Sequence, residues 1–145
     1  MPSPIIHIGF PKTATTWFQK SLFPNIKNVI LAEKDNINRN IIKPNAFVFN
    51  KTEALNAFQT ITTDKRLVIS SERLVGTFNR GWLNGFQPKE LANRLYALFP
   101  DATIIVFIRK QDDAISSAYQ QYIKNGGTYR VNKYLNSSSF FLFNL

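Results

Sequence analysis

A lysine and three threonines gather near the N-terminus of the chain, where Lys12 is followed by hydroxyl side chains at positions 13, 15 and 16. The apolar run at residues 5–8 breaks at Gly9, which predicts a strand that passes into a tight loop. Apolar side chains at helical spacing then predict a helix. Such a loop presents unpaired backbone N–H groups and the positive end of a helix dipole, and Lys12 adds a full charge. The segment is therefore expected to bind a phosphate-like anion.

This loop does not have the spacing of a Walker A motif, which needs a glycine, four residues, and then Gly-Lys followed by Ser or Thr. Here Lys12 comes three residues after Gly9, and no lysine follows a second glycine. The difference disfavours an ordinary ATPase, GTPase or P-loop kinase. A plain strand-to-helix connection with a surface lysine is the alternative interpretation.

A second candidate anion site lies farther along the chain. Arg109 ends an apolar run at residues 102–108, and Ser117 follows about two helical turns later. The guanidinium fork of arginine suits a phosphate group, and a serine hydroxyl on the following helix can donate to the same group. The alternative is an ordinary surface arginine that pairs with Asp112 or Asp113.

Composition limits the classes of function that the chain can have. Its 145 residues suit one domain, and a net charge of +9 favours an anionic partner. The basic residues are scattered instead of clustered, which disfavours nucleic-acid binding. With no cysteine and one histidine, thiolate and His-rich metal sites are excluded. We find neither a signal-peptide pattern nor a run of about 18 apolar residues, so a cytoplasmic protein without a membrane span is expected.

The elements that position these residues follow from the apolar pattern. Strands are expected at residues 5–8, 28–31, 67–70 and 102–108. Helices are expected after the first loop, at 53–62 with Thr52 as N-cap, from 87 to 99, and at 112–125 before Gly126 and Gly127. This alternation predicts a single α/β domain over residues 1–145, with helices on both faces of a central, mostly parallel sheet.

Several finer expectations accompany this outline. The apolar run at 102–108 is typical of a strand covered on both faces. The helix from 87 should direct Leu91, Leu95, Tyr96, Leu98 and Phe99 inward. Residues 33–46 are expected to be a loop, with a short helical turn as an alternative for part of it. Residues 76–87 are expected to be a surface loop, and residues 129–145 a poorly defined tail.

Polar residues follow three of the expected strands, at 9–17, 70–73 and 109–117. In a parallel sheet the carboxyl ends of the strands meet at one edge, where ligands of such folds bind. The three segments are therefore expected to form one site.

Two of these segments resemble the signatures of sulfotransferases that use 3′-phosphoadenosine 5′-phosphosulfate. The stretch Pro11-Lys12-Thr13-Ala14-Thr15-Thr16-Trp17 is similar to the family's P-K-[ST]-G-T-T-W motif. Residues 108–119 resemble its second motif, roughly R-x-P-x-D-x-x-x-S-x-Y, with Arg109, Asp113, Ser117 and Tyr119 in register. The order of the motifs is that of the family, and the bacterial, glycan-type branch is the most similar.

The resemblance implies a P-loop-NTPase-like sulfotransferase fold and an enzyme. It would transfer a sulfuryl group from this donor to a hydroxyl or amine of an acceptor, for which a carbohydrate is a candidate. Lys12 would hold the 5′-phosphosulfate and stabilise the bridging oxygen, while residues 13–16 cradle the phosphate. Arg109 and Ser117 would bind the 3′-phosphate. No metal is required.

Other roles implied by the resemblance are less direct. Trp17 would lie near the adenine, with a core position in the first helix as the alternative. Asp113 and Tyr119 would be structural. Glu72, after the third strand, stands where glycan-type enzymes place a catalytic glutamate; a surface Glu72–Arg73 pair is the alternative. The only histidine, His7, lies inside the first strand and is expected to point into the core.

The chain also departs from the family pattern. Ala14 replaces a glycine, which is acceptable at negative φ and costly at positive φ. Gln111 replaces a common proline. The resemblance covers about residues 4–128, and the family continues with a further strand and a Gly- and Lys-containing loop. We therefore expect a C-terminally truncated, partial domain with an unpaired sheet edge, whose alternative function is nucleotide binding without catalysis.

Overall fold

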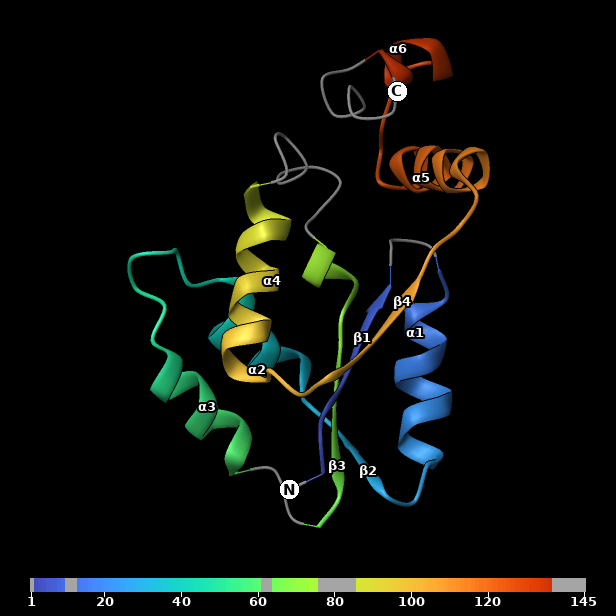
Figure 1. Cartoon of the computed structure of the whole chain (residues 1–145). Coiled ribbons are helices and arrows are strands. Elements are labelled where there is room, and N and C mark those ends of the chain that lie inside the picture. The colour runs from blue at the N-terminus through green and yellow to red at the C-terminus, as the bar shows by residue number, and fades with distance from the viewer. Residues whose placement is uncertain (1, 10–12, 61–63, 76–85, 137–145) are drawn as a thin grey trace.

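The computed structural model describes residues 2–9, 13–60, 64–75 and 86–136 (Figure 1). Its centre is a parallel sheet of four strands in the order β2-β3-β1-β4. The strands are β1 (Ile5–Gly9), β2 (Val29–Leu31), β3 (Arg66–Ser70) and β4 (Thr103–Phe107). The expected α/β class and parallel sheet are confirmed, and each strand lies where an apolar run predicted it.

β1 lies between β3 and β4, although these strands are far apart in the sequence. Its residue His7 is level with Ser70 of β3, and Gly9 is level with Phe107 of β4. The carboxyl ends of all three strands therefore point toward the same edge of the sheet.

One face of the sheet is covered by the helix that follows β1 (Figure 1). This helix begins as α1 (Thr15–Trp17) and continues through a π-helical turn, η1 (Phe18–Leu22), and a 3-10 turn, η2 (Phe23–Asn25). His7 points to this side, and its ring lies 4.8 Å from that of Phe18 and 5.2 Å from that of Phe107. The expected interior position of His7 is confirmed, since its side chain is buried.

The other face carries α2 (Lys34–Ile37), its π-helical continuation η3 (Asn38–Ile42), α3 (Lys51–Gln59) and α4 (Phe86–Leu98). These elements and the sheet enclose the main hydrophobic core, which includes Ile6, Phe58, Ile69, Leu91 and Leu95. Figure 1 shows the sheet between α1 and these helices. Within the described part of the chain, no helix is long and apolar enough to cross a membrane.

The prediction of a loop at residues 33–46 is wrong over most of its length. The helical turn that was the alternative is longer than expected, because α2 and η3 form a continuous helix there. The sequence feature that indicates this helix is the pair Ile37 and Ile41, which are one helical turn apart and both buried. The guanidinium of Arg94, itself buried in α4, donates hydrogen bonds of 2.7 Å to the carbonyls of Ile41 and Pro44 and fixes the end of this segment.

Two predicted details of the helices are also wrong. The N-cap of α3 is Asn50 instead of Thr52, because the Asn50 side chain accepts hydrogen bonds from the backbone N–H groups of Thr52 and Glu53, at 3.0 and 3.2 Å. In α4, Leu91 and Leu95 are buried as expected, but Tyr96 is 72% exposed. Of the loop predicted at 76–87, residues 76–85 lie outside the described residues, and the last two residues belong to α4 instead.

The prediction that residues 102–108 form a strand covered on both faces is wrong. β4 is the last strand of the described sheet, and its Ile104 and Val106 side chains are 57% and 51% exposed. On the opposite face, Ile105 and Phe107 are half-buried toward α1. An apolar run predicts a strand, but its coverage depends on which elements pack against it.

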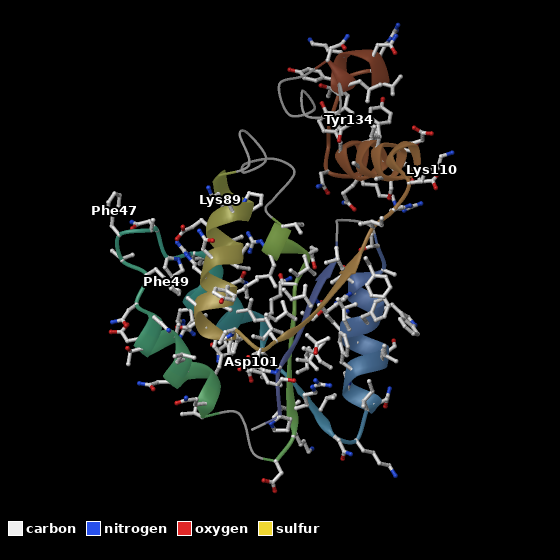
Figure 2. The ribbon with its side chains drawn as sticks, viewed as in Figure 1. Phe47, Phe49, Lys89, Asp101, Lys110 and Tyr134 are labelled. Atoms are coloured by element: carbon white, nitrogen blue, oxygen red, sulfur yellow. The ribbon has the colours of Figure 1, made fainter. Side chains whose placement is uncertain are left out.

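Beyond β4, α5 (Gln111–Lys124) ends where the two glycines predicted. Gly126 has φ +87° and its N–H bonds to the Ile123 carbonyl, while the Gly127 N–H bonds to the Tyr122 carbonyl; together they form a Schellman motif. The predicted tail at 129–145 contains a short helix, α6 (Val131–Leu135). Figure 2 shows Tyr134 between α5 and α6, where it packs against Tyr119 and Tyr122.

Candidate functional site

Three segments with polar residues follow neighbouring strands at the carboxyl edge of the sheet. In spatial order they are η4 (Glu72–Val75) after β3, the loop after β1, and Arg109 after β4. The helix after β1 and the helix after β3 lie on opposite faces of the sheet, so a crevice is expected between these two strands. The predicted convergence of the three segments at one edge agrees with the strand order.

Gly9 is the point at which the loop after β1 comes closest to the following helix. A Cβ atom on Gly9 would overlap Thr15 Oγ1 and would lie 2.8 Å from Thr13 Oγ1. Glycine is therefore required by close approach, and the two threonine hydroxyls converge above it. Pro11 and Lys12, the other predicted members of this loop, lie outside the described residues.

Thr15 has a buried hydroxyl group at the start of α1. The residue is 6% exposed, and its Oγ1 atom makes no hydrogen bond within the described part of the chain. Buried hydroxyls are nearly always hydrogen-bonded, because leaving one unpaired costs about 1–3 kcal/mol. An anion in the loop would provide an acceptor for this hydroxyl.

Replacing Thr15 by valine is expected to stabilise the ligand-free protein by about 1 kcal/mol, because it removes an unpaired buried hydroxyl while keeping the shape. If the loop binds the 5′-phosphate of adenosine 3′,5′-bisphosphate, the product that the expected donor would leave, the same change should weaken that binding by roughly 5- to 10-fold, the loss of one hydrogen bond. Urea unfolding and calorimetric titration measure the two effects.

The matched control is Thr52→Val, because Thr52 is exposed in α3 and far from the loop. Thr52→Val should change neither the free energy of unfolding nor the affinity for the bisphosphate by much. A Thr15→Val protein that is less stable, or that binds the bisphosphate as tightly as the parent chain, contradicts a ligand-facing hydroxyl.

Ala14 has a strained backbone at the start of α1. Its φ and ψ are 60° and 22°, the left-handed region, and it is the only non-glycine residue with positive φ in the described parts of the chain. Its carbonyl accepts the Trp17 N–H at 2.8 Å, which starts the helix. Alanine therefore stands at a position where glycine, the residue found here in the motif that this segment resembles, would avoid a cost of about 1–2 kcal/mol.

Ala14→Gly should consequently stabilise the protein by about 1 kcal/mol, measured by chemical denaturation, because glycine adopts this conformation without strain. Ala57→Gly in the interior of α3 is a control with the opposite sign, expected to destabilise by about 1 kcal/mol. Equal destabilisation by both substitutions would show that Ala14 carries no strain.

Glu72 begins η4 and is half-buried. The alternative pairing with Arg73 is not found: the Arg73 guanidinium donates to the Asn38 side chain at 3.2 Å. The ion pairs among the described residues are Arg94–Glu90 and Lys110–Asp112, and Glu72 belongs to neither.

A buried hydrogen-bond network below the site connects β1, β3 and the first helix, and nothing in the sequence pattern indicated it. His7 Nδ1 and Ser70 Oγ are joined at 2.7 Å, and the Gln19 side-chain amide donates to the Ser70 carbonyl at 2.9 Å. The Ser71 N–H donates to the His7 carbonyl at 3.2 Å. These contacts fix the end of β3, and hence the start of the segment that carries Glu72.

Burial lowers the pKa of His7, and the nearby negative charge of Glu72 offsets only part of this effect. Since the folded state disfavours the charged imidazole, the stability from this group is complete above the unfolded pKa of 6.5 and is lost as the pH falls below it. The free energy of unfolding should therefore decrease as the pH falls below about 6.5, by at most about 1.4 kcal/mol per pH unit.

Because His7 is the only histidine, His7→Gln should remove most of this slope, whatever its effect on absolute stability. Urea unfolding at a series of pH values tests the prediction. An unchanged slope in His7→Gln would assign the pH dependence to another group.

Trp17 and Thr16 lie at the surface beside the loop. Trp17 is 54% exposed and meets Phe18 edge to face, with ring centroids 5.2 Å apart. The alternative of a core tryptophan is therefore wrong, and the exposed indole suits contact with a flat ligand.

Arg109 is exposed two residues after β4, and Ser117 is half-buried on α5. Asp112, one of the acids considered as a partner for Arg109, lies 3.6 Å from the Lys110 ammonium. Asp113 lies in the first turn of α5, where its negative charge interacts favourably with the helix dipole. Tyr119 donates to the Tyr129 carbonyl at 3.0 Å, which supports the structural role expected for it.

A cavity of about 300 Å³ lies at the opposite, amino-terminal end of the sheet, lined by residues that include Pro2, Phe58, Leu98 and Asp101. It is too far along the strands to belong to the candidate site. No group of three or more potential metal ligands occurs within the described residues. Comparison with protein-family models, with curated proteins and with solved structures finds no significant match.

Proposed function

We propose that the chain is a sulfotransferase domain that takes its sulfuryl group from 3′-phosphoadenosine 5′-phosphosulfate. The observation that carries the proposal is the neighbouring order of three strands, which leads the Thr15 loop, Glu72 and Arg109 to one edge of the sheet. A generic phosphate site would explain the loop alone. The two motifs that resemble the family's signatures supply the identity of the donor.

In this proposal the donor spans the edge of the sheet. The 5′-phosphosulfate lies in the loop, where Lys12 and the hydroxyls of residues 13–16 bind it, with the buried Thr15 hydroxyl donating to it. The adenine contacts the exposed ring of Trp17. The 3′-phosphate is bound by Arg109 and Ser117, and this contact distinguishes the donor from ATP.

The transfer requires one bond to form and one to break. The acceptor oxygen or nitrogen attacks sulfur, and the bond between sulfur and the bridging oxygen breaks, so that adenosine 3′,5′-bisphosphate leaves. Lys12 stabilises the negative charge that develops on the bridging oxygen. The Glu72 carboxylate accepts the proton that the acceptor loses. A carbohydrate hydroxyl is a suitable acceptor.

The test compares two nucleotides by calorimetric titration. Adenosine 3′,5′-bisphosphate is expected to bind at least about 10-fold more tightly than ADP, since a charged hydrogen bond to the 3′-phosphate contributes about 1.5–3 kcal/mol. Equal binding of both, or binding of neither, would contradict the proposal.

Turnover is measured separately, as sulfate transfer from labelled donor to simple sugars and amines. Tight bisphosphate binding without transfer to any acceptor would instead favour the second candidate, a nucleotide-binding domain without catalytic activity.

A further inference from the structure

β4 has an open edge within the described sheet. On one side it pairs with β1 along its whole length, and no described strand lies along its other side. The Thr103 N–H donates to the Pro4 carbonyl at 2.8 Å, so the backbone groups of Thr103 and every second residue after it face β1. The backbone groups of Ile104 and Val106 therefore face away from β1, on the side where no described strand pairs with them.

The side chains of this strand are also unusual for an open edge. Edge strands of natural proteins commonly carry charges or proline that prevent pairing. β4 contains neither, and its Ile104 and Val106, together with Ile108 just beyond it, are 57%, 51% and 79% exposed. These three side chains lie on one face because they alternate along the chain.

The ends of β4 carry opposite charges. Asp101 precedes the strand, and Arg109 and Lys110 follow it. Figure 2 shows Asp101 and Lys110 beyond opposite ends of β4. When two such strands are antiparallel, the acidic end of each meets the basic end of the other.

One antiparallel register overlaps all five residues of two β4 strands, and it is centred on Ile105. In this register Ile104 of one copy lies opposite Val106 of the other, so the backbone groups that face outward meet and form reciprocal hydrogen bonds. The same register places Asp101 opposite Arg109 and Ala102 opposite Ile108. In this one register the backbone hydrogen bonds, the apolar side chains and the charges at the strand ends are all complementary.

We propose that two copies of the chain associate through antiparallel pairing of their β4 strands about a two-fold axis, which joins the two sheets into one. The contact is self-complementary, so it closes as a dimer instead of extending into a fibre. Antiparallel pairing also points the carboxyl edges of the two sheets in opposite directions. The two candidate sites therefore open on opposite sides of the dimer.

The first experiment is sedimentation velocity of the whole chain at physiological ionic strength, where the repulsion between two chains of charge +9 is largely screened. We expect a concentration-dependent dimer of the 16.6 kDa chain. Val106→Lys, which places charges at the centre of the paired edge, should raise the dimer dissociation constant at least about 10-fold. The control, Phe47→Lys, alters a fully exposed apolar residue far from β4 and should leave it unchanged (Figure 2).

Two further variants distinguish strand pairing from nonspecific association. Val106→Pro removes an outward N–H group without removing a bond to β1, and it should also give a monomer with an unchanged circular dichroism spectrum. Asp101→Lys should weaken the dimer several-fold through the end charges. In the parent chain, hydrogen exchange at the Ile104 and Val106 amides should slow as the dimer forms, while the Ile105 amide is protected at every concentration.

A chain that stays monomeric up to near-millimolar concentration would overturn the proposal and leave the edge for an extended segment of another protein. A dimer insensitive to both Val106 variants would overturn it in favour of a different interface. Open-ended assemblies would show that the edge pairs without two-fold closure, which also contradicts it.

Discussion

Replacing Glu72 by glutamine is expected to lower the rate of sulfuryl transfer by about 100- to 10,000-fold, the usual contribution of a general base. Glutamine keeps the size and hydrogen-bonding shape of the side chain but cannot accept the acceptor's proton. Glu72 is half-buried at the start of η4 and takes part in none of the ion pairs among the described residues, so the change should leave the fold intact. The measurement is single-turnover transfer from labelled donor.

The affinity for adenosine 3′,5′-bisphosphate separates catalysis from binding in this variant. It should stay within about 3-fold of the parent value, because the proposed contacts of the nucleotide do not include Glu72. Glu53→Gln, an equal change of charge on exposed α3, is the control and should transfer at the parent rate. Full activity of Glu72→Gln would remove this residue from the mechanism without affecting the proposed donor site.

Replacing Arg109 by alanine is expected to weaken bisphosphate binding by about 10- to 100-fold while changing ADP binding by less than about 3-fold, so that the preference for the bisphosphate disappears. The reason is that ADP lacks the 3′-phosphate that the guanidinium is proposed to bind. Arg109 is exposed after β4, and its loss should not unfold the protein. Calorimetric titration with both nucleotides measures the effect.

Lys110→Ala is the matched control for this variant. It removes the neighbouring positive charge, which lies 3.6 Å from the Asp112 carboxylate, and it should weaken both nucleotides equally and only slightly. If Lys110→Ala and Arg109→Ala have the same effect, the site senses net charge and does not recognise a 3′-phosphate.

Local patterns were sufficient to predict the strands and the end of α5. Apolar runs marked all four strands, and Gly126 stopped α5 because its conformation requires φ of +87°. The helix at 34–42 was missed because its polar residues outnumber Ile37, Ile41 and Ile42, and only burial of those three against α3 and α4 reveals their common face. Likewise, no local signal distinguishes an edge strand such as β4 from a central one.

The residues of the candidate site could be predicted from the sequence, but the strand order and the hydrogen bonds that hold them in place could not. The three polar segments could be assigned to strand ends, yet their adjacency depends on the order β3-β1-β4, which arises from packing. The Ser70 contacts of His7 and Gln19 join residues more than 50 positions apart and have no sequence signature. The sequence predicts strain at Ala14 only if its φ is positive, and the backbone has a φ of 60° there.

The position of β1 between β3 and β4 has a consequence for how the protein is made. β1 leaves the ribosome first, but its two neighbours are the third and fourth strands. Its hydrogen bonds to β3 must therefore wait until residue 70 has been synthesised, and those to β4 until residue 107. Such long-range pairing slows folding and leaves apolar strands open to chaperones and to aggregation in the meantime. The loop after β1 is thus the first part of the site to be synthesised and the last to acquire its final shape.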